Sequence, residues 1–137
     1  PFYACNEAKL GWIETTDWTY RCTFATPADA LAPDTRVELV CEGLDTLAEL
    51  TLNGAPLGHA ENMFHPHVFP VAALLRTGEN ELVIRFANTR ERIEKEKARH
   101  FLKESNDPVG GCSNLRKQQC QFGWDWGPRL VTAGIWR

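Results

Sequence analysis

The feature that most constrains the fold is an alternation of bulky and polar residues near the start of the chain. Every second residue in this run is bulky: Trp18, Tyr20, Cys22 and Phe24. A period of two is the side-chain period of a β-strand, because successive side chains point to opposite faces. The run therefore predicts a half-buried strand with four bulky residues on one face.

Further extended segments recur at intervals of about 10–15 residues, with turn residues between them. Asn53-Gly54 predicts a tight hairpin, because both residues tolerate the positive φ of a type I′ turn. Since no helices alternate with the strands, the pattern indicates an all-β sandwich or jelly roll. Strands are expected at 36–41, 47–52, 64–69 and 81–86, with a helical turn at 71–75.

Only the segment 90–103 has the features of a helix. It contains no Gly or Pro, and Ile93, Lys97 and Phe101 recur at the spacing of one helical face. Its mixed charges are typical of a solvated surface helix, and the alternative is a docking surface for another domain. The residues 106–113, with one proline and two glycines, are expected to form a loop that ends the helix.

Charge and length exclude several classes of protein. With 15 Lys and Arg against 18 Asp and Glu, the formal charge of −3 does not favour a nucleic-acid partner. No apolar run approaches the roughly 20 residues that span a bilayer, so no membrane segment is expected. The 137 residues suit a single domain. Because the chain opens at Pro1 without Met and stops at Arg137, we interpret it as a fragment of a longer protein.

The cysteines and histidines do not predict a metal site or a cofactor. The five cysteines are irregularly spaced and contain no C-x-x-C, so they are expected to be mostly free thiols of a reducing compartment. His65 and His67 have no third ligand in the sequence. The cysteines that suggest a cytoplasmic location are Cys5, Cys22, Cys41, Cys112 and Cys120.

The candidate site is Trp124-Asp125-Trp126, bracketed by Gly123 and Gly127. A sugar can stack its C–H face on an indole while vicinal hydroxyls donate to one carboxylate. In a regular strand the tryptophans and Asp125 would point to opposite faces, so a shared site requires the glycines to bend the backbone. Residue type alone favours core packing of both tryptophans.

Other interpretations of the local chemistry stay open or are excluded. Asp125 is a candidate turn carboxylate, or a partner for Arg116 or Lys117 just upstream. No G-x-S-x-G elbow and no phosphate-binding glycine loop occurs. A glycosidase needs two carboxyl groups about 5–5.5 Å apart if it is retaining, and no pair is marked by its sequence context. We therefore assign no catalytic residue to this chain.

Seven segments carry a resemblance to a known family and together extend over essentially the whole chain: 17–21, 43–46, 52–54, 62–64, 75–82, 116–120 and 122–129. They resemble the N-terminal domain of the β-mannosidases of glycoside hydrolase family 2. The Leu-x-x-Gly-x-Asn-x-Leu pattern and the Asn-Gly hairpin are common to the family 2 sugar-binding domains. The segments 116–120 and 122–129 are more specific and indicate β-mannosidases.

The resemblance implies a galactose-binding-like jelly-roll sandwich with one short surface helix, followed in the parent by an immunoglobulin-like domain and a (β/α)₈ barrel. The barrel would carry the catalytic glutamates of a retaining, exo-acting enzyme. Trp124, Asp125 and Trp126 would line the pocket for terminal β-mannose or a manno-oligosaccharide, and this domain would dock on the barrel. A lysosomal location is implied for an animal relative.

Two departures from the family pattern limit what this chain does alone. The family domain begins some tens of residues earlier with an additional strand, and the catalytic region is absent after Arg137. The isolated chain is therefore expected to hydrolyse nothing. The alternatives are a free-standing carbohydrate-binding module and a domain that only braces the barrel of another family 2 glycosidase.

Overall fold

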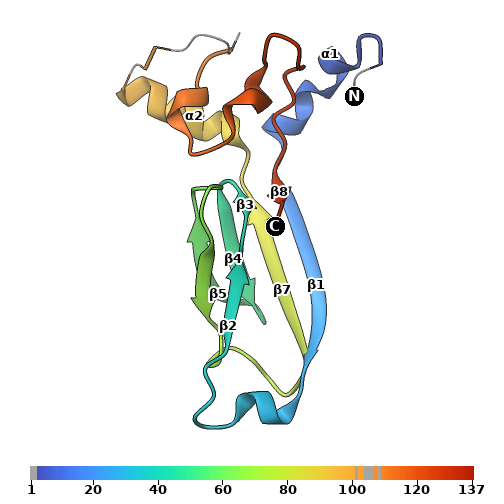
Figure 1. Cartoon of the computed structure of the whole chain (residues 1–137), viewed down its shortest axis with the longest axis vertical. Helices are drawn as coiled ribbons and strands as arrows, with labels where there is room; N and C mark the ends of the chain where they lie inside the picture. Colours follow the sequence, from blue (N-terminus) through green and yellow to red (C-terminus); the bar gives the residue numbers. More distant parts are fainter. Residues whose placement is uncertain (1–2, 101, 104–106, 108) are drawn as a thin grey trace.

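In the computed structural model the chain forms a β-sandwich, with a helical region at one end of the strands (Figure 1). This confirms the predicted fold class. The structure describes residues 3–100, 102–103, 107 and 109–137. The strands are β1 (Trp18–Thr26), β2 (Glu38–Cys41), β3 (Leu44–Asp45), β4 (Ala48–Leu52), β5 (Ala55–Ala60), β6 (His67–Pro70), β7 (Gly78–Phe86) and β8 (Gly134–Ile135). The helices are α1 (Asn6–Leu10) and α2 (Thr89–Arg99), with short 3₁₀ segments η1 (Gly11–Thr15), η2 (Ala28–Leu31), η3 (Cys112–Asn114) and η4 (Gln119–Phe122).

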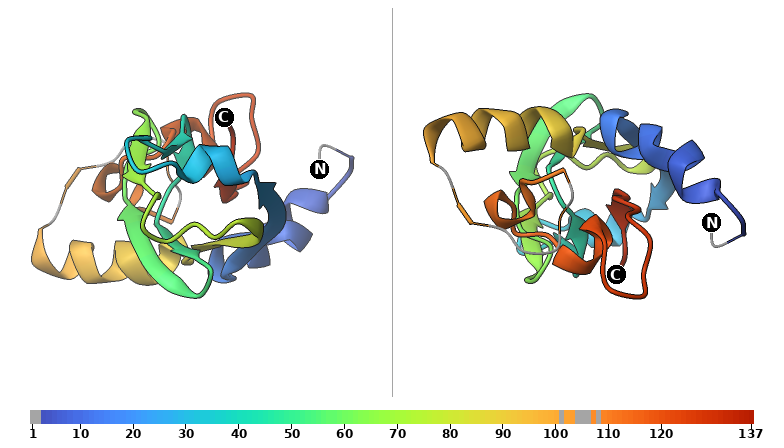
Figure 2. Two further views of the ribbon diagram at one scale, coloured as in Figure 1. Left: turned by 90° about the horizontal axis from the view of Figure 1, so that it is seen from below. Right: turned by 90° about the horizontal axis from the view of Figure 1, so that it is seen from above.

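The strands form one larger sheet and two short pairs. The larger sheet is antiparallel with the order β1-β7-β4-β5. It faces the pair β2–β6, while β3 and β8 pair at the end nearest the helices. Seen along the long axis, α2 and the N-terminal segment extend to opposite sides of the sandwich (Figure 2). None of the described helices is long and apolar enough to cross a membrane.

The main core lies between β4 and β7 of the larger sheet and the pair β2–β6. Leu50, Ile84 and Phe86 are buried there, and Leu39 and Phe69 pack against them from the facing pair. Burial of such apolar side chains is the principal force that holds two sheets together. A smaller apolar cluster beneath α2 contains Ile93, Cys112, Leu115, Phe122 and Val131.

The predicted hairpin at Asn53-Gly54 is confirmed. Asn53 has φ 54° and Gly54 has φ 80°, which are the positive values that the turn requires. The Asn53 amide also donates to Asn80 at 2.7 Å, and Asn80 is buried. The Asn80 side chain accepts from the Arg76 backbone N–H at 2.8 Å and donates to the Gly78 carbonyl at 2.9 Å. The asparagine of the Leu-x-x-Gly-x-Asn-x-Leu pattern therefore holds this turn against the hairpin.

Helix α2 is shorter than the helix predicted at 90–103. Its charged side chains are exposed or half-buried, which agrees with the predicted charged surface. It begins at an Asn88 cap that accepts from the Glu91 N–H at 3.1 Å, and it ends where His100 becomes extended. Ile93 is its fully buried apolar residue, Lys97 is half-buried, and Phe101 lies outside the described residues. Gly111 has φ 117°, and a Cβ there would lie 1.9 Å from Ile93, so only glycine fits.

Strand β1 differs from its prediction in burial. Its bulky residues do share one face, yet Tyr20 is 42% exposed, Phe24 is 39% exposed, and Cys22 is exposed as well. The reason is strand order, because β1 is an edge strand and the facing pair lies over other strands. The short helix α1 and the two-residue strands β3 and β8 were not predicted, since two residues show no alternation and the five residues of α1 form little more than one helical turn.

Candidate functional site

The candidate loop 123–128 projects from the helical end as a tight turn. Gly123 has φ 108° and redirects the backbone after the buried Phe122. The Trp124 N–H donates to the Gly127 carbonyl at 3.1 Å, and the Gly127 N–H donates to the Trp124 carbonyl at 3.3 Å. These two bonds close the turn and leave Asp125 and Trp126 at its tip. Gly123 thus bends the backbone, and the bonds between Trp124 and Gly127 close the bend that a shared site requires.

The tip residues face solvent. Trp126 is 86% exposed, Trp124 is 46% exposed, and Asp125 is exposed too. The core-packing interpretation of the two tryptophans is therefore wrong. Asp125 makes no hydrogen bond or ion pair with the part of the chain that the structure describes. Its carboxylate is available to a ligand.

The suggested pairing of Asp125 with Arg116 or Lys117 is also wrong. Lys117 is buried and its Nζ lies 2.6 Å from Asp45 Oδ1. Arg116 is exposed and makes no ion pair with the described residues. The two cations just upstream of the loop are thus directed elsewhere, because β3 supplies a buried carboxylate that the sequence places 72 residues away.

A hollow of about 330 Å³ lies beside the loop. It is lined by the three tip residues together with Gly127, Pro128, Ala4 and Glu7. Its volume is at the low end for small-molecule sites, and exposed indoles with one carboxylate are a suitable lining for a sugar. The hollow is open to solvent.

The loop is anchored on its C-terminal side by Arg129. The guanidinium Nη1 lies 2.7 Å from Glu14 Oε2, and its Nε donates to Asp107 Oδ1 at 3.3 Å. The Arg129 backbone N–H donates to Glu7 Oε1 at 2.7 Å, and the guanidinium stands 5.6 Å from the Phe122 ring centroid. Glu14, Asp107 and Arg129 are all largely buried, so these pairs are sheltered from solvent.

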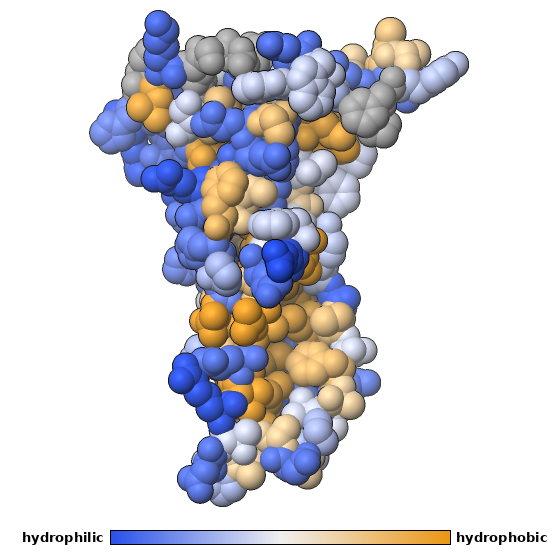
Figure 3. All heavy atoms as spheres, in the orientation of Figure 1, coloured by the Kyte–Doolittle hydropathy of each residue, from blue (hydrophilic) through white to orange (hydrophobic). Residues whose placement is uncertain are grey.

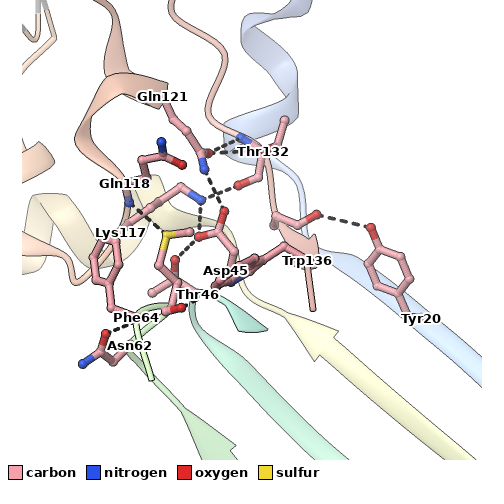
Figure 4. Close-up of polar contacts among 12 residues, drawn as sticks. Tyr20, Asp45, Thr46, Asn62, Phe64, Lys117, Gln118, Gln121, Thr132 and Trp136 are labelled. Carbon is pink, nitrogen blue, oxygen red and sulfur yellow. Dashed lines mark hydrogen bonds and ion pairs between the residues drawn. The ribbon is translucent and has the colours of Figure 1, made fainter. Parts of the chain in front are cut away.

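The two chain segments that flank the loop are joined by a second group of polar contacts, shown in Figure 4. The Lys117 ammonium donates to Asp45 Oδ1 and to the Thr132 carbonyl, each at 2.6 Å. Gln121 Nε2 donates to Asp45 Oδ2 at 2.9 Å, and the Gln121 carbonyl oxygen of the side chain accepts from the Thr132 N–H at 3.2 Å. Gln121 and Thr132, which flank the loop on its two sides, are thereby held together.

Burial has an electrostatic cost for Lys117 and Asp45. Removal from solvent lowers the pKa of Lys117 below its ordinary value, and the charge of Asp45 with its hydrogen bond opposes this. The Thr46 hydroxyl also donates to Asp45. The desolvation of the two charges therefore offsets much of their attraction. The directional bonds of the Lys117–Asp45 pair fix the position of the residues that flank the loop relative to β3.

These anchors were missed by sequence reasoning. Glu14, Asp107 and Asp45 lie in separate parts of the chain, and nothing in their sequence context marks them as partners of Arg129 or Lys117. A usable signal was the position of those two cations, one on each side of a loop with two tryptophans. Neither His65 nor His67 joins the site, and the described residues contain no group of three or more potential metal ligands.

Comparison with known proteins gives concordant results. Residues 1–137 match the family described as the glycosyl hydrolase 2 galactose-binding domain-like family. The chain is 39% identical to β-mannosidase B of Thermothelomyces thermophilus and 35% identical to β-mannosidase of Capra hircus, over its full length. It spans 16% of the length of each of these relatives. The crystal structure of a β-D-mannosidase from Dictyoglomus thermophilum aligns with all of this chain and 17% of its own, with a TM-score of 0.92 and 39% identity.

Proposed function

Because the chain belongs to the glycosyl hydrolase 2 galactose-binding domain-like family, we propose that it is the non-catalytic N-terminal domain of a retaining, exo-acting β-mannosidase. In this proposal the domain docks on a catalytic barrel, and its Trp124-Asp125-Trp126 loop forms one wall of the pocket for terminal β-mannose. The observation that carries the proposal is the exposed tip of the loop, where two indoles and an uncommitted carboxylate meet.

The chemistry of the tip suits a pyranose. A carboxylate accepts two hydrogen bonds, so Asp125 can bind neighbouring hydroxyl groups of one sugar. An indole offers a flat apolar surface for the C–H face of the ring. These contacts select and orient a sugar, whereas bond cleavage needs a pair of carboxyl groups that we do not assign to this chain.

The buried anchors suit the proposed role because a pocket wall must hold its position. The ion pairs of Arg129 and Lys117 connect the loop to η1 and β3, and the Arg129 backbone N–H connects it to α1. Positioning of substrate to within a fraction of an ångström is a large part of enzymatic rate enhancement. A loop held on both sides by directional bonds meets that requirement better than one held by apolar contacts alone.

The direct test is Asp125→Ala in the full-length enzyme. Loss of hydrogen bonds to a charged group is expected to lower kcat/KM on an aryl β-mannoside about 10- to 150-fold. Asp34→Ala is the matched control, because Asp34 is also an exposed carboxylate but lies at the opposite end of the sandwich, after η2. Unchanged kinetics for Asp125→Ala would remove the residue from the pocket.

An NMR titration of the 137-residue chain separates the alternatives. With mannose and β-1,4-mannobiose we expect no saturable shift of the Trp124 and Trp126 indole signals, because the hollow has only one wall. Saturable shifts would instead indicate a free-standing carbohydrate-binding module. A domain that only braces the barrel would show neither these shifts nor the kinetic effect of Asp125→Ala.

A further inference from the structure

A second hollow lies beside β8, where the sandwich meets the helical end. Its volume is about 530 Å³, which falls within the range of small-molecule sites. Its lining includes three aromatic rings and three polar side chains without formal charge: Tyr20, Phe64, Trp136, Gln118, Gln121 and Thr132. It is distinct from the hollow beside the loop 123–128, because none of the described residues lines both.

The Trp136 indole is held in a fixed position at this hollow. Its N–H donates to the Met63 carbonyl at 3.2 Å. The ring packs so closely on Gly43 that a Cβ there would lie 2.3 Å from it, so a larger residue at this position would displace the ring. The indole is nevertheless 53% exposed. It therefore offers a fixed, flat apolar surface, on which the C–H face of a sugar ring can stack.

The same buried methionine positions Gln118 at the hollow. The Gln118 backbone N–H donates to the Met63 sulfur at 2.9 Å, and the Met63 N–H donates to the Arg116 carbonyl at 3.0 Å. Gln118 is exposed, and its side-chain amide makes no hydrogen bond with the described residues. This amide has two donors and one acceptor oxygen available to a ligand.

The other two rings lie on opposite sides of Asp45 (Figure 4). Phe64 is 62% exposed, and its backbone N–H donates to Asn62 Oδ1 at 2.9 Å. The Tyr20 hydroxyl donates to the Ala133 carbonyl at 3.3 Å, and its oxygen can still accept a hydrogen bond. At the level of β8 the surface mixes hydrophobic and hydrophilic side chains, whereas hydrophobic ones predominate lower on the sandwich (Figure 3). A mixed lining suits a ligand with both apolar faces and hydroxyl groups.

The charges at the hollow favour a neutral ligand. Asp45 is the one charged side chain among the described residues that line it. Both of its carboxylate oxygens are already bonded, since Oδ1 accepts from Lys117 and Oδ2 accepts from Gln121. An ionic ligand would leave water without a countercharge, which is costly. A neutral saccharide avoids this cost, and its hydroxyl groups can bond the free amide while its C–H faces cover the rings.

We propose that this hollow is a second saccharide site, which binds a neutral pyranose unit inside a β-1,4-mannan chain through the Trp136 indole and the Gln118 amide. The choice of mannan rests on the proposed function, whereas the saccharide class follows from the lining of the hollow. Because the hollow is open to solvent, an internal unit can lie in it while its neighbours extend outward. The terminal unit binds at the loop 123–128 instead.

The test is affinity electrophoresis of the full-length enzyme in native gels that contain soluble β-1,4-galactomannan. Internal units far outnumber chain ends in this polymer, so retardation reports on a site for internal units. We expect the polymer to retard the wild type, and Trp136→Ala to raise the Kd obtained from the retardation at least about 10-fold, because the stacking surface is lost. Trp12→Ala is the matched control with an unchanged Kd, because Trp12 is also 53% exposed and does not line the hollow.

Gln118→Ala tests the site without disturbing the fold, because the side chain is exposed and makes no hydrogen bond with the described residues. We expect its Kd to rise about 2- to 10-fold through the loss of neutral hydrogen bonds. A Kd equal to that of the wild type would overturn the proposal. Absence of retardation in the wild type would overturn it as well, and would show that the hollow does not take the polymer in the full-length enzyme.

Asp125→Ala separates this site from the proposed function. Asp125 does not line the hollow, so this variant should be retarded as strongly as the wild type. Loss of retardation in Asp125→Ala would assign the polymer to the loop 123–128 and overturn the second site. Normal kinetics of Asp125→Ala on the aryl β-mannoside would instead contradict the proposed function, and the retardation of the Trp136 and Gln118 variants would still decide whether the hollow binds a saccharide.

Discussion

The sandwich and the loop-bearing end of this molecule are stabilised by different forces. The sandwich is held by apolar side chains such as Leu50, Ile84 and Phe86, whose contacts have little directionality. The other end has a small apolar cluster, and its loop is anchored by buried ion pairs of Lys117 and Arg129. Apolar packing tolerates a small change of shape, whereas removal of one partner of a buried ion pair leaves the other charge buried and uncompensated. The candidate site lies at the loop-bearing end, where buried ion pairs fix the geometry.

The strongest challenge to this comparison is Lys117→Met, which keeps much of the side-chain length and removes the charge. Asp45 would then stay buried without its cation, so we expect the free energy of unfolding to fall by about 3–5 kcal/mol. Urea unfolding of the chain measures this. Lys95→Met is the matched control, because Lys95 pairs with Glu91 on the surface of α2, and its effect should stay below about 0.5 kcal/mol. Similar losses for the two variants would contradict a special role of the buried pair.

A conservative substitution in the main core tests how much the sandwich depends on exact packing. Ile84 is 3% exposed in the main core, and Ile84→Val removes one methylene group there. We expect a loss of about 0.5–1.5 kcal/mol in the same urea experiment, since the neighbours can relax around a small gap. A loss as large as that of Lys117→Met would show that packing at this position is as exacting as the ion pair.

The smallest effect is expected for an exposed ion pair between the two regions. The backbone N–H of Asn88 and then the neighbouring Arg85 lower the pKa of Asp17, against the opposing effect of partial burial. Because the folded-state pKa lies below the unfolded value, the stabilisation is present at neutral pH and is lost as pH falls through the folded pKa. Asp17→Asn should cost less than about 1 kcal/mol at pH 7, because Asp17 is more than one-third exposed.

This difference between wild type and Asp17→Asn should shrink steadily when unfolding is followed below about pH 4. Asp34→Asn is a suitable control, because Asp34 is exposed and has no partner among the described residues. A difference that is independent of pH would show that Asp17 acts through hydrogen bonding alone.

Local elements of the fold were accessible from sequence. The alternation from Trp18 to Phe24 predicted β1, and the positive φ values of Asn53 and Gly54 follow from residue chemistry within the turn itself. The positive φ of Gly123, 108°, likewise depends on residue chemistry within the candidate loop, where the sequence analysis had made a bend the condition for a shared site. The charged face of α2 was predicted by its mixed charges and then observed as ion pairs such as that of Lys95 with Glu91. Each of these depends on interactions between residues close in the chain.

Sequence patterns predicted the longer strands, the turn chemistry and the candidate residues. The tertiary structure decided which of those residues are exposed. Trp126 projects into solvent while Phe122, four residues earlier, is fully buried, and Tyr20 stays exposed on a strand whose pattern predicted burial. Lys117 binds Asp45 rather than Asp125, although Asp125 is far closer in sequence. The physical reason is that burial and ion pairing depend on strand order and on contacts between distant segments, which local periodicity does not encode.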